Sequence, residues 1–315
     1  MAVTWPDEVD EVLGGDLTCA AAYVTPAGGA VVAAVAPIGL RDRAAGTVGF
    51  TTSLGFGRKL ERIKRDPKVA LAYHTREHGI GDLDNPRFVL VQGTASFDPT
   101  PDRDALDRIG DQSAPYLGPP RRGAFWDRWL RAYYADRVLV TVTVERILVW
   151  PDLAATGTPD IFGAALPSVE PDPQRPPVKG TGARVDVTKT AARVAKLPHR
   201  LLGYRQADGY PRVVPVRVAG SSGGGVHLTV PAGLPQGGRR AGLLAHAYRP
   251  QLIGLESRQY TGWLEVADSA AVYAPHTAAG FTAPPNKTIL LLANGFLARR
   301  GLARARKSGR AEAVR

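Results

Sequence analysis

Residues 46–74 constrain the fold of this chain more than any other segment. They predict a strand, a glycine-containing turn, a short basic helix and a second strand. β-Branched and aromatic residues dominate Thr47–Thr52, which is typical of a strand. Gly55 and Gly57 allow a tight turn, and Pro67 ends the basic helix that follows. Hydroxyl groups at the strand end, backbone amides of the turn and the helix cations together predict a site for a phosphate-sized anion.

The rest of the first half has the same alternation of strands with a few helices. Strands are expected at Thr18–Thr25, Ala30–Ala36, Lys68–His74, Phe88–Phe97 and Arg137–Trp150, and helices at Asp7–Leu13, Thr100–Ile109 and Gly123–Tyr134. This order predicts a mostly antiparallel β-barrel with peripheral helices (α+β) over residues 1–152.

The second half resembles the first half in its order of predicted elements. Residues 153–182 are rich in proline, which predicts a connector without regular structure over most of its length. Over residues 183–297 a strand pair, a glycine-rich turn and further strands recur. Gly237–Arg240 is expected to take the place of Gly57–Lys59, and Pro231 stands where the first half has hydroxyl residues. We therefore expect two barrels in one chain, the second with a lost or altered anion site.

The turn also carries a resemblance to a known family. Thr51, Thr52, Ser53, Arg58 and Lys59 resemble, in order and spacing, the phosphate-binding segment of split β-barrel flavoproteins of the pyridoxamine 5'-phosphate oxidase-like superfamily. The strand that ends at Trp150 is similar to the closing strand of that family. The resemblance covers about residues 10–152. It has one extra residue, Phe56, in the turn, and it lacks the cations that oxidase members carry on their second strand.

This resemblance implies a cofactor and an architecture. The cofactor is FMN or coenzyme F420, and the sequence leaves this choice open. The five residues of the turn would bind it, and Gln92 would lie on a strand that crosses its ring system. Two such barrels in one chain would pair as an intrachain pseudo-dimer that binds one cofactor, with further oligomerisation left open.

The implied activity is hydride transfer between the bound cofactor and a small conjugated substrate. Such cofactors supply the chemistry themselves, and no acid or base is assigned. His276 and Lys287 are candidates for the substrate or cofactor face. Asn286 is expected to cap a helix over Ile289–Leu297, and a cation in its first turn favours a nearby anion. A flavin- or haem-binding protein without catalytic activity is the alternative.

Composition bears on partners and compartment. Residues 298–315 contain seven basic residues against Glu312 and so supply +6 of the net charge of +11. A disordered tail that binds another macromolecule is therefore a third hypothesis, although no specific nucleic-acid motif accompanies it. Cys19 is the one cysteine, which excludes an internal disulfide. The sequence predicts no metal site, no signal peptide and no membrane span, and hence a cytoplasmic protein.

Overall fold

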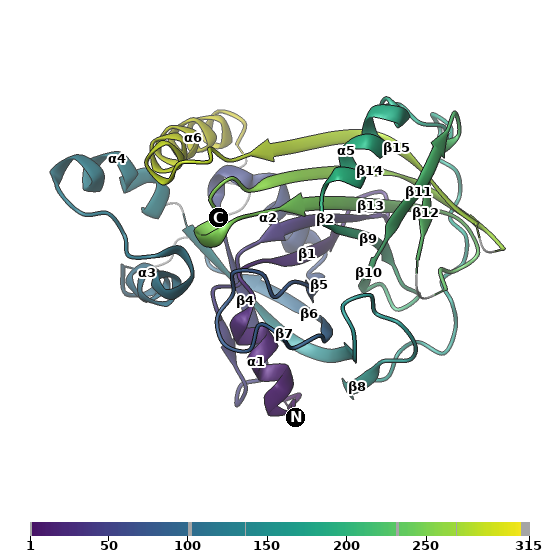
Figure 1. Ribbon diagram of the computed structural model, residues 1–315, viewed down its shortest axis with the longest axis horizontal. Helices are drawn as coiled ribbons and strands as arrows, with labels where there is room; N and C mark the ends of the chain where they lie inside the picture. The colour runs from purple at the N-terminus through teal and green to yellow at the C-terminus, as the bar shows by residue number, and fades with distance from the viewer. Residues whose placement is uncertain (1, 100–102, 136, 231–232, 269, 310–315) are drawn as a thin grey trace.

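Two antiparallel β-sheets with peripheral helices make up the protein. The computed structural model describes residues 2–99, 103–135, 137–230, 233–268 and 270–309. The sheet of the first half and the sheet of the second half lie against each other, and helices α3, α4 and α6 gather beside one end of them (Figure 1). The predicted fold class is confirmed, because the chain is mainly β with two sheets and helices at the periphery.

The first sheet has eight strands among the described residues. Its order is β2-β1-β5-β6-β7-β4-β3, with β8 paired to β7. The strands are β1 Cys19–Val24, β2 Ala30–Val35, β3 Arg41–Asp42, β4 Thr47–Ser53, β5 Lys68–Tyr73, β6 Phe88–Phe97, β7 Arg137–Trp150 and β8 Asp160–Gly163. The predicted strands are confirmed to within one residue at each end. The two-residue strand β3 and the strand β8 were not predicted, and the proline-rich connector contributes β8 to the first sheet.

The second sheet has seven strands in the described part of the chain. Its order is β10-β9-β13-β14-β15-β12-β11. The strands are β9 His199–Arg205, β10 Pro211–Pro215, β11 Arg217–Ser222, β12 Gly225–Thr229, β13 Gly237–Ala247, β14 Glu256–Ala267 and β15 Ala270–Thr282. The two orders are the same when strands are numbered within each half. β9 therefore takes the place of β1, and β13 takes the place of β5.

The strand register extends this correspondence to individual residues. The β1–β2 hairpin is closed by a bond from the Thr25 amide to the Gly29 carbonyl, and the β9–β10 hairpin by one from Gln206 to Tyr210. Counting from these turns, Ala21 corresponds to Leu202. Leu71 pairs with Ala21, and Leu243 pairs with Leu202, so Leu71 corresponds to Leu243. Three residues further along β5 and β13, His74 therefore corresponds to His246.

Each sheet buries a core of its own on one face and packs against the other sheet with its second face. On β5, Leu71 and Tyr73 enter the first core, whereas Ala70 and Ala72 face the second sheet, as the two-residue period of a strand requires. The cluster between the sheets contains three pairs of corresponding residues, namely Ala20 with Leu201, Val32 with Val213, and Ala72 with Leu244. The same face of each sheet thus forms the contact.

The helices lie in the connections and at the chain end. They are α1 Asp7–Gly15, α2 Gly57–Arg65, α3 Arg103–Leu117, α4 Ala124–Ala135, α5 Val187–Lys196 and α6 Lys287–Lys307, with 3-10 turns η1 Leu54–Phe56 and η2 Pro250–Leu252. α3 extends well beyond the predicted end at Ile109, and residues 100–102 lie outside the described residues. No helix in the described ranges is long and apolar enough to cross a membrane.

Two predictions about the second half are wrong. Gly237–Arg240 does not form a turn with a helix start; it is the beginning of strand β13. There Arg239 is buried and donates hydrogen bonds to the carbonyls of Pro171, Pro235 and Gln236. The expected disordered tail is also wrong for residues 298–307, which continue helix α6. The predicted domain limits at 152, 182 and 297 stay predictions, and residues 310–315 lie outside the described residues.

Candidate functional site

The predicted anion turn connects β4 to α2. The hydroxyl of Ser53 accepts a hydrogen bond from the amide of Gly55 at 3.0 Å, which starts the 3-10 turn η1 directly after the strand. Thr51 and Thr52 are buried at the strand end. Within the described residues the Thr52 hydroxyl has no hydrogen-bond partner. A buried hydroxyl without a partner is costly, and so this end of β4 suits a ligand that carries acceptor atoms.

The two cations of the turn differ in their surroundings. Arg58 is exposed, and no side-chain hydrogen bond or ion pair of Arg58 is found within the described ranges. The Lys59 ammonium lies 5.8 Å from the ring centroid of Phe50. Removal from water lowers the pKa of Lys59 to about 8. An anion bound beside Lys59 would offset this cost of burying a positive charge.

Helix α6 lies on the anion turn. A Cβ atom at Gly301 would stand 3.3 Å from Cα of Gly55, so the two glycines let the helix and the turn approach closely. Leu302 packs against the first core beside them. At the other face of α6, the Trp129 indole donates a hydrogen bond to the Leu292 carbonyl at 3.1 Å. Helix α6 therefore covers the turn, and α4 lies beside α6 (Figure 1).

The structure places Gln92 away from this turn, between the two sheets. Its amide nitrogen donates to Gln206 Oε1 and to the Pro211 carbonyl, both at 2.6 Å. Its amide oxygen accepts a hydrogen bond from Arg146 Nε at 2.5 Å, and Arg146 also forms an ion pair with Asp208. Gln92 is fully buried, and protein groups already use its amide on both sides. The predicted contact with a cofactor ring stays a prediction.

The two remaining candidates lie in separate places. His276 Nε2 lies 3.1 Å from the carbonyl of Thr181 in the connector. The Lys287 ammonium donates to Gln251 Oε1 at 2.6 Å and to the Leu117 carbonyl at 3.3 Å. Asn286 caps α6 as expected, because its side chain accepts hydrogen bonds from the two amides that follow Lys287. These contacts do not bring His276 or Lys287 to the anion turn.

A histidine cluster that the sequence analysis did not identify lies where the two sheets meet. Nε2 of His74 and Nε2 of His246 are 2.7 Å apart, and the ring of His199 lies within 5.7 Å of both rings. His74 Nδ1 lies 2.9 Å from the Ala72 carbonyl and must donate to it. His74 Nε2 is therefore an acceptor, His246 Nε2 carries the proton between them, and His246 Nδ1 is unprotonated.

Burial keeps both members of this pair neutral. Loss of hydration lowers the pKa of His74 to about 3 and lowers that of His246 well below its ordinary value. The unprotonated Nδ1 of His246 has no partner in the described part of the chain. Among those residues, no group of His, Cys, Asp or Glu is placed to bind a metal ion.

A cavity of about 820 Å³ opens beside the cluster, and we call it the junction pocket. It is lined by residues 74–78 and Leu83 of the first half, by three residues of the connector (Leu153, Ala154 and Thr156), and by residues 198–201, 215–217 and Thr229 of the second half. Thr229 pairs with Arg217, as Thr51 pairs with Ala36 in the first sheet. When residues are counted from the turns of the β1–β2 and β9–β10 hairpins, Arg217 corresponds to Ala36. The pocket thus lies at the strand end that corresponds to the anion turn.

Some charged residues of the junction pocket have partners within the protein and others do not. Arg76 forms a buried ion pair with Asp16 at 2.5 Å. Glu77 lies 3.2 Å from His199 Nε2. Arg217 is exposed, and no side-chain partner is found for it in the described ranges. Arg200 donates to the Ala195 carbonyl at 3.2 Å, but its Nε is buried without a partner.

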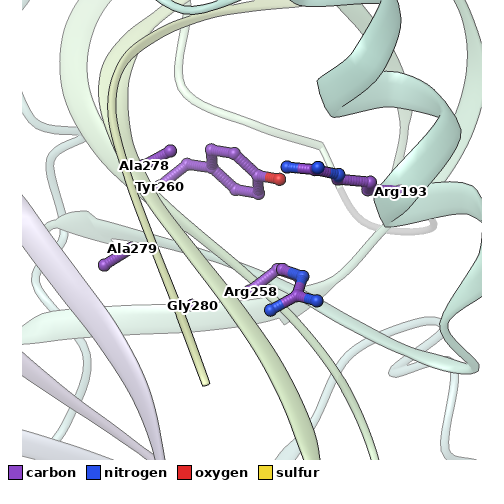
Figure 2. A pocket seen from close by; sticks show the side chains of 6 residues that line it. All are labelled: Arg193, Arg258, Tyr260, Ala278, Ala279 and Gly280. Atoms are coloured by element: carbon purple, nitrogen blue, oxygen red, sulfur yellow. The ribbon is translucent and has the colours of Figure 1, made fainter. Parts of the chain in front are cut away.

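A second cavity, of about 350 Å³, lies in the second sheet beneath α5. Figure 2 shows the Tyr260 hydroxyl pointing toward the Arg193 guanidinium, with Arg258 close by. Arg258 pairs with Glu256 at 2.8 Å and donates to Thr282 at 3.1 Å. The charge of Arg258 is therefore matched by Glu256, although its Nε is buried without a partner in the described residues. Because this cavity has less than half the volume of the junction pocket, the junction pocket is the stronger candidate for an organic anion.

No family model and no curated protein matches this chain. Several solved structures are similar to about half of it. A conserved hypothetical protein of Mycobacterium tuberculosis shares 21% identity over 48% of this chain and 87% of its own, with a TM-score of 0.36. An F420 reductase shares 25% identity over 45% of this chain and 98% of its own, with a TM-score of 0.33.

A third similar structure is a protein of Clostridium acetobutylicum that is related to general stress protein 26 and described as of the pyridoxinephosphate oxidase family. It shares 14% identity over 50% of this chain and 92% of its own, with a TM-score of 0.34. Each of the three similarities spans about half of this chain and most of the other one. The two-sheet fold itself follows from the strand order and register described above.

Proposed function

We propose that this protein binds a flavin-type cofactor, FMN or coenzyme F420, with its phosphate at the anion turn, and transfers a hydride between it and a small conjugated substrate. The observation that carries the proposal is that one strand-end segment holds both a largely desolvated cation and a buried hydroxyl that has no partner in the described residues. Lys59, whose pKa burial lowers to about 8, and the Thr52 hydroxyl lie in one strand-end turn. A phosphate bound there would supply both a counter-charge and acceptor atoms.

The protein's own residues would bind and shield the cofactor. Ser53 already orders the turn through the Gly55 amide, and Arg58 has its guanidinium free for a phosphate. α6 lies over the turn through Gly301 and would limit access of water. When bound, the flavin or deazaflavin ring supplies the hydride chemistry, and the fold supplies position and a dry surrounding.

We further propose that the two sheets act as an intrachain pseudo-dimer. In a two-fold interface, when a residue of one half contacts a residue of the other half, the counterparts of these two residues also contact each other. The direct contact of His74 with its counterpart His246 fits this rule. Likewise Lys68 lies over the Tyr210 ring. The counterparts of these two residues are Arg240 and Gly29, and they also lie against each other. Because the described part of the second half has no helix between β12 and β13, we expect one such cofactor per chain.

Titration of the cofactor-free protein with FMN and, separately, with coenzyme F420 tests the proposal. One of them is expected to bind with a stoichiometry of one per chain. Arg58→Ala and Lys59→Ala should each weaken binding at least tenfold, whereas Lys64→Ala, on the exposed face of the same helix, should not. Failure of both cofactors to bind, or equal binding by all variants, would overturn the phosphate site, and two tightly bound cofactors per chain would overturn the single-site pseudo-dimer.

A cofactor that binds but that no hydride donor reduces would leave the fold and the phosphate site intact and remove the hydride-transfer step. Reduction is followed by the loss of the absorbance of the oxidised ring. The same measurement separates an enzyme from a protein that only binds the cofactor.

A further inference from the structure

The junction pocket differs in chemistry from its counterpart in the first half. At the anion turn, a helix with two cations follows the strand, and α6 closes over it. At the corresponding end of β12 no such helix occurs in the described residues, and a cavity of about 820 Å³ is present instead. Cavities of about 300–1,000 Å³ are typical of sites for small molecules. The fold relates the two places, but their residues offer different chemistry to a ligand.

We propose that the junction pocket binds a small organic molecule with an apolar or aromatic body and a carboxylate. The charges of its lining favour an anionic group. Of its three arginines, Arg76 pairs with Asp16, whereas Arg200 and Arg217 have no carboxylate partner in the described part of the chain. An uncharged ligand would leave these two cations unmatched.

Arg200 and Arg217 are the residues that bind the carboxylate. Both line the pocket, and the buried Nε of Arg200 lacks a hydrogen-bond acceptor in the described part of the chain. Arg217 lies at the start of β11, where its backbone pairs with that of Thr229, and its guanidinium has no partner among the described residues. A carboxylate bound by the terminal nitrogens of Arg200 and Arg217 would form charge-assisted hydrogen bonds, which are stronger than neutral ones.

The walls of the pocket suit an apolar body. Leu83 and Leu153, both partly exposed, lie on the side of the first sheet and the connector, and Leu201 and Val216 lie on the side of the second sheet. Exposed leucines that face a cavity gain from burial by a ligand. The two sheets and the connector all contribute, so the site exists only in the folded pair.

His199 would orient the ligand rather than bind its charge. Its Nε2 lies 3.2 Å from Glu77, and burial lowers its pKa while Glu77 opposes that shift. The ring stands 5.8 Å from that of Tyr248 and lies against His246, so its plane is held by neighbours. It forms a fixed edge on the polar side of the pocket.

Fluorescence titration of the full chain with 2-naphthoate tests this proposal, with 2-naphthamide as the uncharged match. We expect naphthoate to bind at least tenfold more tightly than the amide. Arg200→Gln and Arg217→Gln should each weaken naphthoate binding about tenfold, because each removes one charge-assisted contact. Arg193→Gln, an exposed arginine outside the pocket, is the control and should leave binding unchanged.

The result that overturns the proposal is equal binding of naphthoate and naphthamide, no binding of naphthoate, or binding that neither pocket variant weakens. Displacement of naphthoate by FMN or coenzyme F420 would also overturn it, because the pocket would then be the cofactor site. Arg58→Ala and Lys59→Ala should weaken the cofactor and leave naphthoate binding unchanged, which separates this proposal from the proposed function. Arg217 is exposed, so its variant is expected to fold, and thermal unfolding of each variant checks this.

Discussion

The neutral histidine pair makes stability depend on pH. In the unfolded chain a histidine has a pKa of about 6.5, whereas burial lowers the pKa of folded His74 to about 3 and lowers that of His246 as well. Between these values the unfolded state binds more protons, so stability falls as pH falls below about 6.5. For His74 alone the loss is about 2 kcal/mol at pH 5.

Urea unfolding at pH 7 and pH 5 measures this loss. His246→Gln should reduce the difference between the two pH values, because one buried histidine no longer titrates on unfolding. His227→Gln, whose ring contacts only Ser222 among the described residues, is the matched control and should leave the difference unchanged. A His246 variant with the full pH dependence would contradict the neutral buried pair.

Lys59 is predicted to lower the stability of the cofactor-free protein. Its pKa of about 8 in the folded state means that burial disfavours its charge at neutral pH. Lys59→Met should therefore raise the free energy of unfolding by about 1–2 kcal/mol, discounted for the partial exposure of the side chain. The same change should weaken cofactor binding. Unfolding by urea without cofactor checks the first effect; a variant less stable than the wild type would contradict it.

At the scale of elements, local sequence predicted the strands well and two helix ends poorly, those of α3 and α6. The apolar run of β5 and the composition of β4 were sufficient because neighbouring residues determine them. α6 continues past Leu297 because every residue from 298 to 307 except Gly301 is Ala, Leu, Arg or Lys, and these four residue types favour helix. The error at Gly237–Arg240 has a different cause: the carbonyl of Pro171, far away in sequence, helps to bury Arg239 in a strand.

The close contact of α6 with the anion turn gives a prediction for the helix. Gly301→Val places side-chain atoms against Gly55, where a Cβ alone would already be 3.3 Å from Cα. α6 should move away from η1, and hydrogen exchange of the amides at 54–57 should accelerate at least tenfold. Ala303→Val places the same β-branched side chain on the exposed face of the same helix, away from η1, and is the control. Equal exchange in both variants would contradict the contact.

At the scale of the whole molecule, the sequence predicted two related halves but not the surface between them. The order of elements in residues 201–230 resembles that of the first half, and the sheets have the same strand order. The meeting of His74 with His246 and the junction pocket depend on which faces pack together. That packing arises from contacts between residues more than 100 positions apart, which local patterns do not contain. The anion turn was predictable because one short segment supplies all its residues.

The shared interface predicts that the two sheets unfold together. Arg146 on β7 is almost fully buried and pairs with Asp208 in the β9–β10 hairpin, while Gln92 joins both sides of the contact. Asp208→Ala leaves the Arg146 charge buried without a carboxylate and should cost about 2–4 kcal/mol. Asp84→Ala removes an exposed carboxylate and is the control.

The fluorescence of Trp5 in the first core and of Trp263 in the second sheet reports on each half separately when the other tryptophans are replaced. Both transitions should shift to lower urea by the same amount in Asp208→Ala, because the cluster between the sheets includes Trp150, Leu201 and Leu244 and is lost as one unit. A shift confined to one tryptophan would mean that each sheet is stable without the other. The junction pocket would then depend on a docking equilibrium, and naphthoate binding would weaken in Asp208→Ala even before either sheet unfolds.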